Sequence, residues 1–186
     1  MTIHSKIPSI GLGTYMMSPE EAEEMTYEAI KIGYRHIDTA EVYRNEQGVA
    51  KGIERSLSEG LVSRSELFIT TKVFPGNEIW GQSQKTFDDV TESLDNSLKR
   101  LKLEYVDLYL IHSAHANKTR IEQWKALLEL KSMGKITYAG VANWNIKHLQ
   151  EINDADLPLP DTNQIELHPW AQQPELVEYL QNNNVH

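Results

Sequence analysis

The sequence contains no cysteine among its 186 residues. A chain without cysteine has no disulfide framework, no thiol nucleophile and no cysteine-ligated zinc or iron–sulfur site. Basic residues are also scarce, because 18 Lys and Arg stand against 27 Asp and Glu, for a net charge of −9. Nucleic acid is bound by a basic surface. The charge balance therefore argues against a nucleic-acid partner.

Long hydrophobic runs are absent as well. No apolar run approaches the roughly 18 residues of a membrane-spanning helix, and Met1–Lys6 lead into no apolar signal-peptide core. We therefore expect a cytoplasmic protein without a membrane partner. A mass of 21.3 kDa predicts one compact domain over residues 1–186.

Short apolar runs alternate with longer segments of helical spacing. The apolar runs predict strands over Ser9–Gly13, Arg35–Thr39, Leu67–Lys72, Val106–His112, Ile136–Ala142 and Thr162–Glu166. The other segments predict helices over Ser18–Gly33, Asn45–Ser58, Ser83–Lys102, Thr119–Met133, Ile146–Ile152 and Pro174–Asn183. Strict alternation predicts a parallel α/β sheet with right-handed crossovers.

Two architectures fit this alternation. One is a doubly wound open sheet, and the other is a (β/α)8 barrel of which the chain supplies about six units. Gly11 and Gly13 end the first strand, but no third glycine follows at the spacing of the dinucleotide-binding fingerprint, and no P-loop sequence occurs. Their absence weakens the doubly wound alternative without deciding between the two.

Polar side chains stand at the ends of three neighbouring predicted strands. Asp38 lies near the end of the second strand, Lys72 ends the third and His112 ends the fourth. In a parallel barrel these strand ends share one rim, where barrel enzymes keep their active sites. Each residue alone is more often structural, as a helix cap or a core residue, but the three together indicate a site.

Tyr43, five residues past Asp38, adds an acid to this set. A tyrosine phenol has a pKa of about 10, too high for efficient proton donation at neutral pH. A nearby ammonium lowers that pKa, so we expect Lys72, paired with Asp38, to make Tyr43 a usable general acid. With His112 donating a hydrogen bond, the set would protonate and polarise a carbonyl group.

Four motifs resemble those of the aldo-keto reductase superfamily. They are Gly33–Ala40 followed by Tyr43–Glu46, then Leu67–Val73, Val106–His112 and Asn163–Pro169. They match that family's second-strand signature, its lysine strand, its histidine strand and its sixth strand. The resemblance extends along the whole chain, and its motifs are highly specific.

The resemblance implies a (β/α)8 TIM barrel that reduces aldehydes or ketones to alcohols with hydride from NADPH. Tyr43 resembles the family's proton donor, and Lys72 and Asp38 resemble the pair that tunes it. His112 resembles the residue that orients and polarises the carbonyl. The implied cofactor-binding positions are Gly13, Thr14, Asp38, Asn143 and Gln164, and the implied substrate-binding positions are Tyr15, Phe74, Trp80 and His112.

The chain departs from the family pattern at three places. Ala142 stands where the family usually has serine before the asparagine that Asn143 represents, so one hydrogen bond to the cofactor carboxamide is expected to be lost. Ser113-Ala114-His115 replaces the aromatic residue and proline that follow the histidine in many members, which predicts a wider or more polar pocket. The sequence ends before a seventh strand, so we expect a fragment of a longer chain.

Rival interpretations remain. A catalytically weak or inactive reductase-like protein used for binding or regulation is the main alternative to an active reductase. A metal site formed by His112, His115 and His168 is not expected. A metal ion usually requires three or four convergent ligands that are themselves held by hydrogen bonds. Trp124 has core spacing, whereas Trp144 and Trp170 are candidates for lining a pocket. The partner is expected to be a small molecule, and the protein a monomer or weak oligomer.

Overall fold

The computed structural model describes residue 3 and residues 6–186. Residues 1–2 and 4–5 lie outside the described residues, so part of the Met1–Lys6 segment, which the sequence predicts not to begin a signal peptide, is not described. The elements follow in the order β1 (Leu12–Gly13), α1 (Pro19–Lys31), β2 (His36–Asp38), η2 (Glu41–Tyr43), α2 (Glu46–Ser58), η3 (Arg64–Glu66), β3 (Phe68–Val73), η4 (Glu78–Trp80), α3 (Phe87–Leu101), β4 (Val106–Ile111), α4 (Arg120–Ser132), β5 (Ile136–Ala142), α5 (Ile146–Asp154), β6 (Thr162–Gln164) and α6 (Pro174–Asn182).

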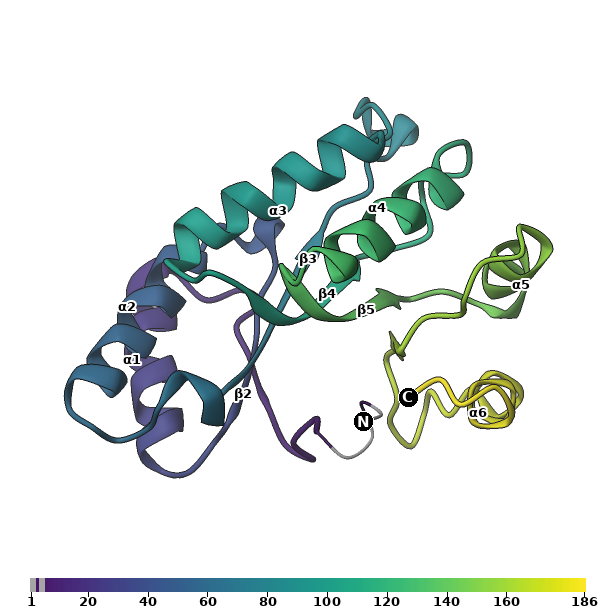
Figure 1. Cartoon of the computed structure of the whole chain (residues 1–186). Helices are drawn as coiled ribbons and strands as arrows, with labels where there is room; N and C mark the ends of the chain where they lie inside the picture. Colours follow the sequence, from purple (N-terminus) through teal and green to yellow (C-terminus); the bar gives the residue numbers. More distant parts are fainter. Residues whose placement is uncertain (1–2, 4–5) are drawn as a thin grey trace.

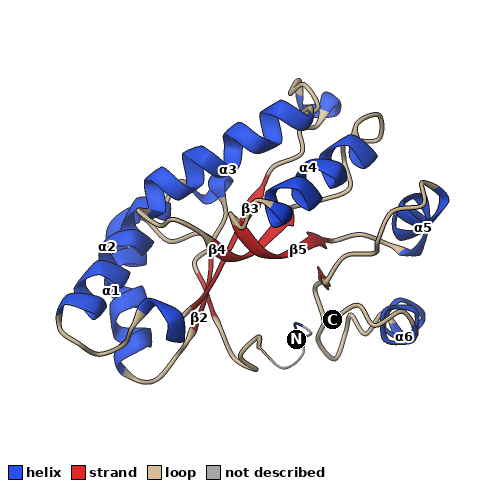
Figure 2. Ribbon diagram, in the orientation of Figure 1, coloured by secondary structure: helices blue, strands red, loops and turns tan. Residues whose placement is uncertain are grey.

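The strands form one parallel sheet whose order in space, β1 to β6, is their order in sequence. A doubly wound sheet would reverse this order at a switch point, so the sequential order excludes that alternative and confirms the barrel prediction. The sheet curls, and the helices lie outside the curve, as in part of a (β/α)8 barrel (Figures 1 and 2).

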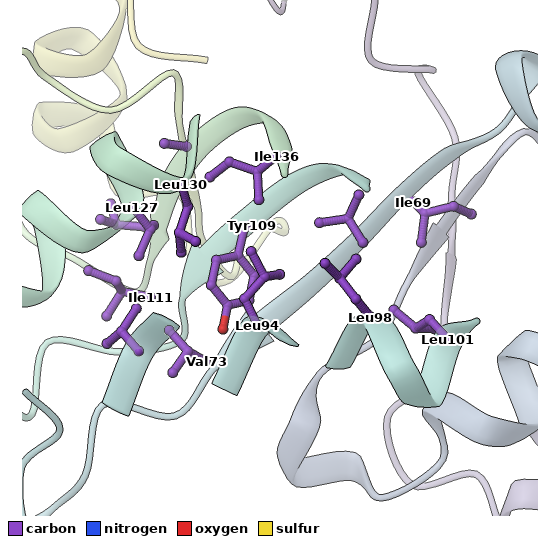
Figure 3. Packing of buried hydrophobic residues seen from close by; sticks show 14 of the residues in the cluster. Ile69, Val73, Leu94, Leu98, Leu101, Tyr109, Ile111, Leu127, Leu130 and Ile136 are labelled. Carbon is purple, nitrogen blue, oxygen red and sulfur yellow. The ribbon is translucent and has the colours of Figure 1, made fainter. Parts of the chain in front are cut away.

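The core has two layers because successive side chains of a strand point to opposite faces. On the outer face, β-strand side chains such as Ile69, Tyr109 and Ile111 pack against leucines of the helices, including Leu94 and Leu127 (Figure 3). On the inner face, Phe68, Leu108, Leu110 and Ala142 of the strands form a second cluster with Ile3, which precedes β1. Lys72 has the same parity in β3 as Phe68, so its side chain points into the barrel interior.

The predicted elements are confirmed in type and order, with shifted ends. The helix predicted from Ser83 begins at Phe87 instead, because Thr86 and Asp89 form a reciprocal capping box that fixes its first turn. The first and sixth strands are shorter than predicted. Each is an edge strand with a hydrogen-bonded neighbour on one side only, so less backbone is held in the ladder.

The structure also bears on the membrane prediction. Among the residues that it describes, no helix combines the length and the apolar character needed to cross a membrane.

Two glycines bring α1 and α2 into close contact. A Cβ at Gly48 would overlap the Pro19 carbonyl oxygen, and a Cβ at Gly52 would lie 2.6 Å from the Glu23 carbonyl oxygen. We expect Gly48→Ala to lower the free energy of unfolding by about 3 kcal/mol, because overpacking against backbone leaves no flexible atom to yield. Urea unfolding followed by circular dichroism measures the loss. Gln47→Ala, at an exposed position of the same helix, is the control, and equal midpoints for the two variants would contradict the expected overlap.

Candidate active site

The carboxyl ends of the strands line one rim of the curved sheet. Parallel pairing sets Gly13 beside Asp38, and it sets Lys72 beside Leu110, one residue before the end of β4. On β5 and β6, Ala142 pairs with Gln164. The polar residues predicted at the strand ends therefore share one edge, as barrel geometry requires.

Lys72 and Asp38 form an ion pair, as predicted, in which Lys72 is buried and Asp38 is partly exposed. The Lys72 side chain is 1% exposed, and its ammonium group donates to Asp38 Oδ1, to the Thr39 carbonyl oxygen at 3.0 Å and to Tyr43 OH at 3.4 Å. All three ammonium hydrogens are thus accounted for. A charge this far from water is tolerated because it is both paired and hydrogen-bonded.

Tyr43 is brought to this pair by the short η2 helix that directly follows β2. Its hydroxyl lies 3.4 Å from Lys72 Nζ and 3.4 Å from His112 Nε2. The Tyr43 and His112 rings meet edge to face with centroids 5.5 Å apart. The structure therefore gathers the four predicted catalytic residues, Asp38, Tyr43, Lys72 and His112, into one chain of contacts.

The expectation that Lys72 lowers the pKa of Tyr43 is wrong for this structure. Burial raises the pKa of Tyr43 to about 12, and the charges of Asp38 and Tyr15 act in the same direction. The physical reason is that Asp38 offsets the positive charge of Lys72, whereas burial penalises the phenolate directly. Tyr43 consequently keeps its proton at neutral pH and is available as a donor.

His112 is held in its neutral form. Burial lowers its pKa to about 4, and the Lys72 charge adds to that effect. Its Nδ1 atom is buried without a hydrogen-bond partner among the described residues. An orphaned N–H is costlier and rarer than an orphaned acceptor, so we assign the ring proton to Nε2. That tautomer aims an N–H donor at the space beside the Tyr43 hydroxyl.

The low pKa of His112 makes the stability pH-dependent. Its folded-state pKa of about 4 lies below the ordinary 6.5. Between these two pH values His112 is therefore more protonated in the unfolded chain than in the folded one. We expect the free energy of unfolding to fall as the pH is lowered from about 6.5 to about 4. His36 and His148 also have lowered pKa values, so urea midpoints across this range should be compared with those of His112→Asn. A variant with the same pH slope would refute the assignment to His112.

A pocket of about 340 Å³ opens beside these residues. It is lined by Tyr15, Val42, Tyr43, Phe74, His112, Ser113, His115 and Asn143. Tyr15 packs on Tyr43 with ring centroids 5.1 Å apart. Of the predicted substrate-binding residues, Tyr15, Phe74 and His112 line this pocket directly.

Trp80 lies outside the pocket, behind the residues of its wall. It is exposed at the end of η4, its ring stacks on Phe74 at 6.1 Å, and it lies 5.5 Å from the His115 ring. It supports two residues of the pocket wall without lining the pocket itself. Trp144, a second candidate, is 1% exposed and packs in the outer core, whereas Trp170 is 91% exposed. Neither residue lines this pocket. Trp124 is a core residue, as predicted.

The predicted cofactor residues fall into two groups. Asn143 and Gln164 are exposed on the rim, with Asn143 Nδ2 donating to the His112 carbonyl oxygen and Gln164 Nε2 donating to Asp38 Oδ2 at 2.8 Å. Their amide oxygens have no protein partner among the described residues and suit the N–H groups of a carboxamide. Gly13 is exposed as well, and a Cβ there would meet no atom within 4 Å, so a flat ring has room beside Asp38.

Thr14 differs from the other cofactor candidates. It is fully buried. Its N–H and hydroxyl both donate to the Asp38 carbonyl oxygen, and its own carbonyl oxygen accepts from Asn45 Nδ2 at 2.7 Å. These bonds make Thr14 an anchor for the first loop, so its hydroxyl does not face the rim.

Two residues that organise the site, Asn45 and Glu41, were not predicted from the sequence. Asn45 is buried and bonds to the carbonyl oxygens of Thr14 and Met17, so it fixes the loop that carries Tyr15. Glu41 accepts from the Phe74 amide and from Lys85, each at 2.6 Å. The motif around Tyr43 contains Asn45, but nothing in its spacing reveals that its partners lie in an earlier loop.

The histidines do not form a metal centre in the described part of the chain, where no group of three or more His, Cys, Asp or Glu side chains is placed to hold a metal ion. His168 instead bonds Glu166 at 2.7 Å and accepts from the Trp170 amide.

Comparison with known families decides the relationship. The family model for the aldo/keto reductase family matches residues 9–186. The chain belongs to the aldo-keto reductase family. This membership is consistent with the sheet order and with the four residues that meet at the rim.

Individual relatives support this assignment. The aldo-keto reductase chain is 43% identical over 171 residues to methylglyoxal reductase DkgA of Escherichia coli, covering 91% of this chain and 58% of the relative. It is 41% identical over 182 residues to glyoxal reductase of Bacillus subtilis, covering 97% and 61%. An aldo-keto reductase of Bombyx mori solved in complex with NADP superposes with a TM-score of 0.85 at 34% identity, covering 96% and 61%. The chain thus spans about three fifths of the length of these relatives.

The departures from the family pattern now have positions in this aldo-keto reductase. Ala142 is buried against the inner core cluster and has no hydroxyl to offer the rim. Ser113 and His115 line the pocket. The first departure leaves no side-chain hydroxyl at position 142, and the second places polar groups in the pocket wall.

Proposed function

We propose that the protein reduces a small aldehyde or ketone to an alcohol. The observation that carries the proposal is the position of the Tyr43 hydroxyl, which lies 3.4 Å from both Lys72 Nζ and His112 Nε2 at a pocket of about 340 Å³. A neutral phenol flanked by an ammonium and an imidazole N–H suits a carbonyl oxygen that gains negative charge during reaction.

NADPH is the proposed cofactor. Its nicotinamide ring supplies hydride when bound. Asn143 and Gln164 would hold the carboxamide through their free amide oxygens, and Gly13 would leave room for the ring beside Asp38. The preference for NADPH is supported by the Bombyx mori relative, which was solved in complex with NADP.

The remaining chemistry belongs to side chains of this chain. His112 Nε2–H donates to the substrate carbonyl oxygen and orients it. Tyr43 transfers its proton to the same oxygen as negative charge builds there. Lys72, 3.4 Å from the Tyr43 oxygen, stabilises the phenolate that remains, and Asp38 keeps Lys72 charged in its buried position.

Small carbonyl compounds are the proposed substrates. The pocket lies near the lower end of the usual range of ligand-site volumes, about 300–1,000 Å³. The E. coli and B. subtilis relatives are named as reductases of methylglyoxal and glyoxal, and their names support the same size class here.

The direct test is loss of NADPH absorbance when the purified protein is mixed with methylglyoxal. We expect aldehyde-dependent NADPH consumption with one alcohol formed per NADPH. Saturable binding of NADPH without any turnover, across a panel of aldehydes, would instead support the alternative of a reductase-like binding protein. NADH in place of NADPH tests the choice of cofactor in the same assay.

A further inference from the structure

Ser113 and His115 form a polar pair in the pocket that the proton-transfer steps do not use. They lie in the loop after β4, directly beyond His112, and both line the pocket. Ser113 Oγ and His115 Nδ1 are 2.8 Å apart. His112 lines the same pocket as Ser113 and His115, so the pair faces the space that a molecule held by His112 would occupy.

The pair offers hydrogen bonds in either tautomer of a neutral imidazole. If Ser113 donates to Nδ1, the ring carries its proton on Nε2 and the serine oxygen remains an acceptor. If Nδ1 donates to Ser113, the serine hydroxyl is free to donate and Nε2 is the acceptor. One donor and one acceptor are therefore free in each case, which suits a hydroxyl or a second carbonyl group.

A serine–histidine contact also occurs in nucleophilic enzymes, but this pair lacks their third member. Among the described residues no carboxylate hydrogen-bonds to the His115 ring, whose recorded contacts are Ser113 and the Trp80 ring. A histidine that acts as a general base is normally oriented by such a group. Ligand recognition is the role that the geometry supports.

We propose that Ser113 and His115 bind a second oxygen of the substrate, so that the site prefers aldehydes and ketones with a carbonyl or hydroxyl group on the adjacent carbon. The proposal rests on the proposed reductase function. The reacting oxygen lies between Tyr43 and His112, and the second oxygen meets the Ser113–His115 pair. The neighbouring Tyr15, Val42 and Phe74 then cover the carbon skeleton.

The kinetic test compares substrates with the same number of carbons. Methylglyoxal and glyceraldehyde carry an oxygen on the adjacent carbon, whereas propanal does not. We expect Ser113→Ala to lower kcat/KM for the first two about fivefold, the effect of one neutral hydrogen bond, and to change it less than twofold for propanal. His115→Phe should show the same pattern, and His115→Asn, which retains a donor and an acceptor, should restore part of the loss. Ser132→Ala, at an exposed position in α4, is the matched control.

A binding test makes the result independent of turnover. The ring signals of His115, assigned by their loss in His115→Phe, are followed by NMR while 1,2-propanediol or 1-propanol is added. We expect saturable shifts with the diol and much smaller ones with the mono-alcohol. If wild-type protein reduces no aldehyde but the diol still shifts His115, the reductase function fails and the second-oxygen site stands. The site would be overturned if the Ser113 and His115 variants lost as much kcat/KM on propanal as on methylglyoxal and glyceraldehyde, or if the two alcohols shifted His115 equally. Either result would leave carbonyl reduction intact.

Discussion

Tyr43→Phe is expected to reduce kcat for carbonyl reduction by at least about 100-fold, because a positioned general acid contributes about 10²–10⁴-fold. The substitution removes the only group in the Lys72–Tyr43–His112 chain that presents a neutral O–H to the pocket. The phenyl ring retains its edge-to-face contact with His112, so the fold should be preserved. NADPH affinity should be unchanged, because Tyr43 is absent from the proposed carboxamide contacts.

The measurement separates chemistry from binding. Aldehyde-dependent NADPH consumption gives kcat and KM, and cofactor fluorescence gives the Kd of NADPH. Tyr34→Phe removes the hydroxyl of a tyrosine in the loop between α1 and β2, at the opposite end of β2 from the rim, and is the matched control. If Tyr43→Phe retained the wild-type kcat, another residue would be the proton donor.

The second large effect is expected from Lys72→Met. Its ammonium group is buried and satisfies Asp38, the Thr39 carbonyl oxygen and the Tyr43 hydroxyl together. Removal of one partner leaves the Asp38 carboxylate near the interior without its counter-charge, which costs about 3–5 kcal/mol in buried pairs. We expect about 3 kcal/mol, because Asp38 remains partly exposed and keeps its bond from Gln164. Turnover should fall as well, since no cation then stabilises the Tyr43 phenolate.

A double-mutant cycle identifies the source of this loss. Urea midpoints are measured for Lys72→Met, Asp38→Asn and the double variant. We expect the double variant to be more stable than Lys72→Met alone, because it contains no uncompensated carboxylate. Additive losses would show that Lys72 stabilises the fold through its packing rather than through its charge.

The parallel sheet and the position of the site were predictable from local pattern, whereas the choice of a barrel over a doubly wound sheet came from the family resemblance. Strict alternation of strands and helices specifies parallel pairing, and parallel pairing brings Asp38, Lys72 and His112 to the same edge. The inward direction of Lys72 follows from its parity with Phe68 in β3. These inferences depend only on neighbours along a strand or in adjacent strands.

The unpredicted features depend on burial and on loops. The sequence places a lysine near Tyr43, but it does not show how far the phenol is removed from water, and that burial raises its pKa to about 12. Thr14 turns inward because Asn45, from a different loop, binds its carbonyl oxygen. Trp144 follows a strand end as a pocket residue would, yet the chain directs it into the outer core. A monomeric or weakly associating state and a cytoplasmic location stay predictions.

The bond from Gln164 to Asp38 also has a consequence for how the site assembles. Each strand pairs with the one that precedes it, so the sheet can grow unit by unit, and each new strand closes a loop of one strand–helix unit. The Gln164–Asp38 bond instead joins residues 126 positions apart. It closes a long loop and forms only when β6 has docked. During synthesis, the Asp38–Lys72 pair can therefore form early, whereas the Gln164 side of the rim is completed only after most of the chain has folded.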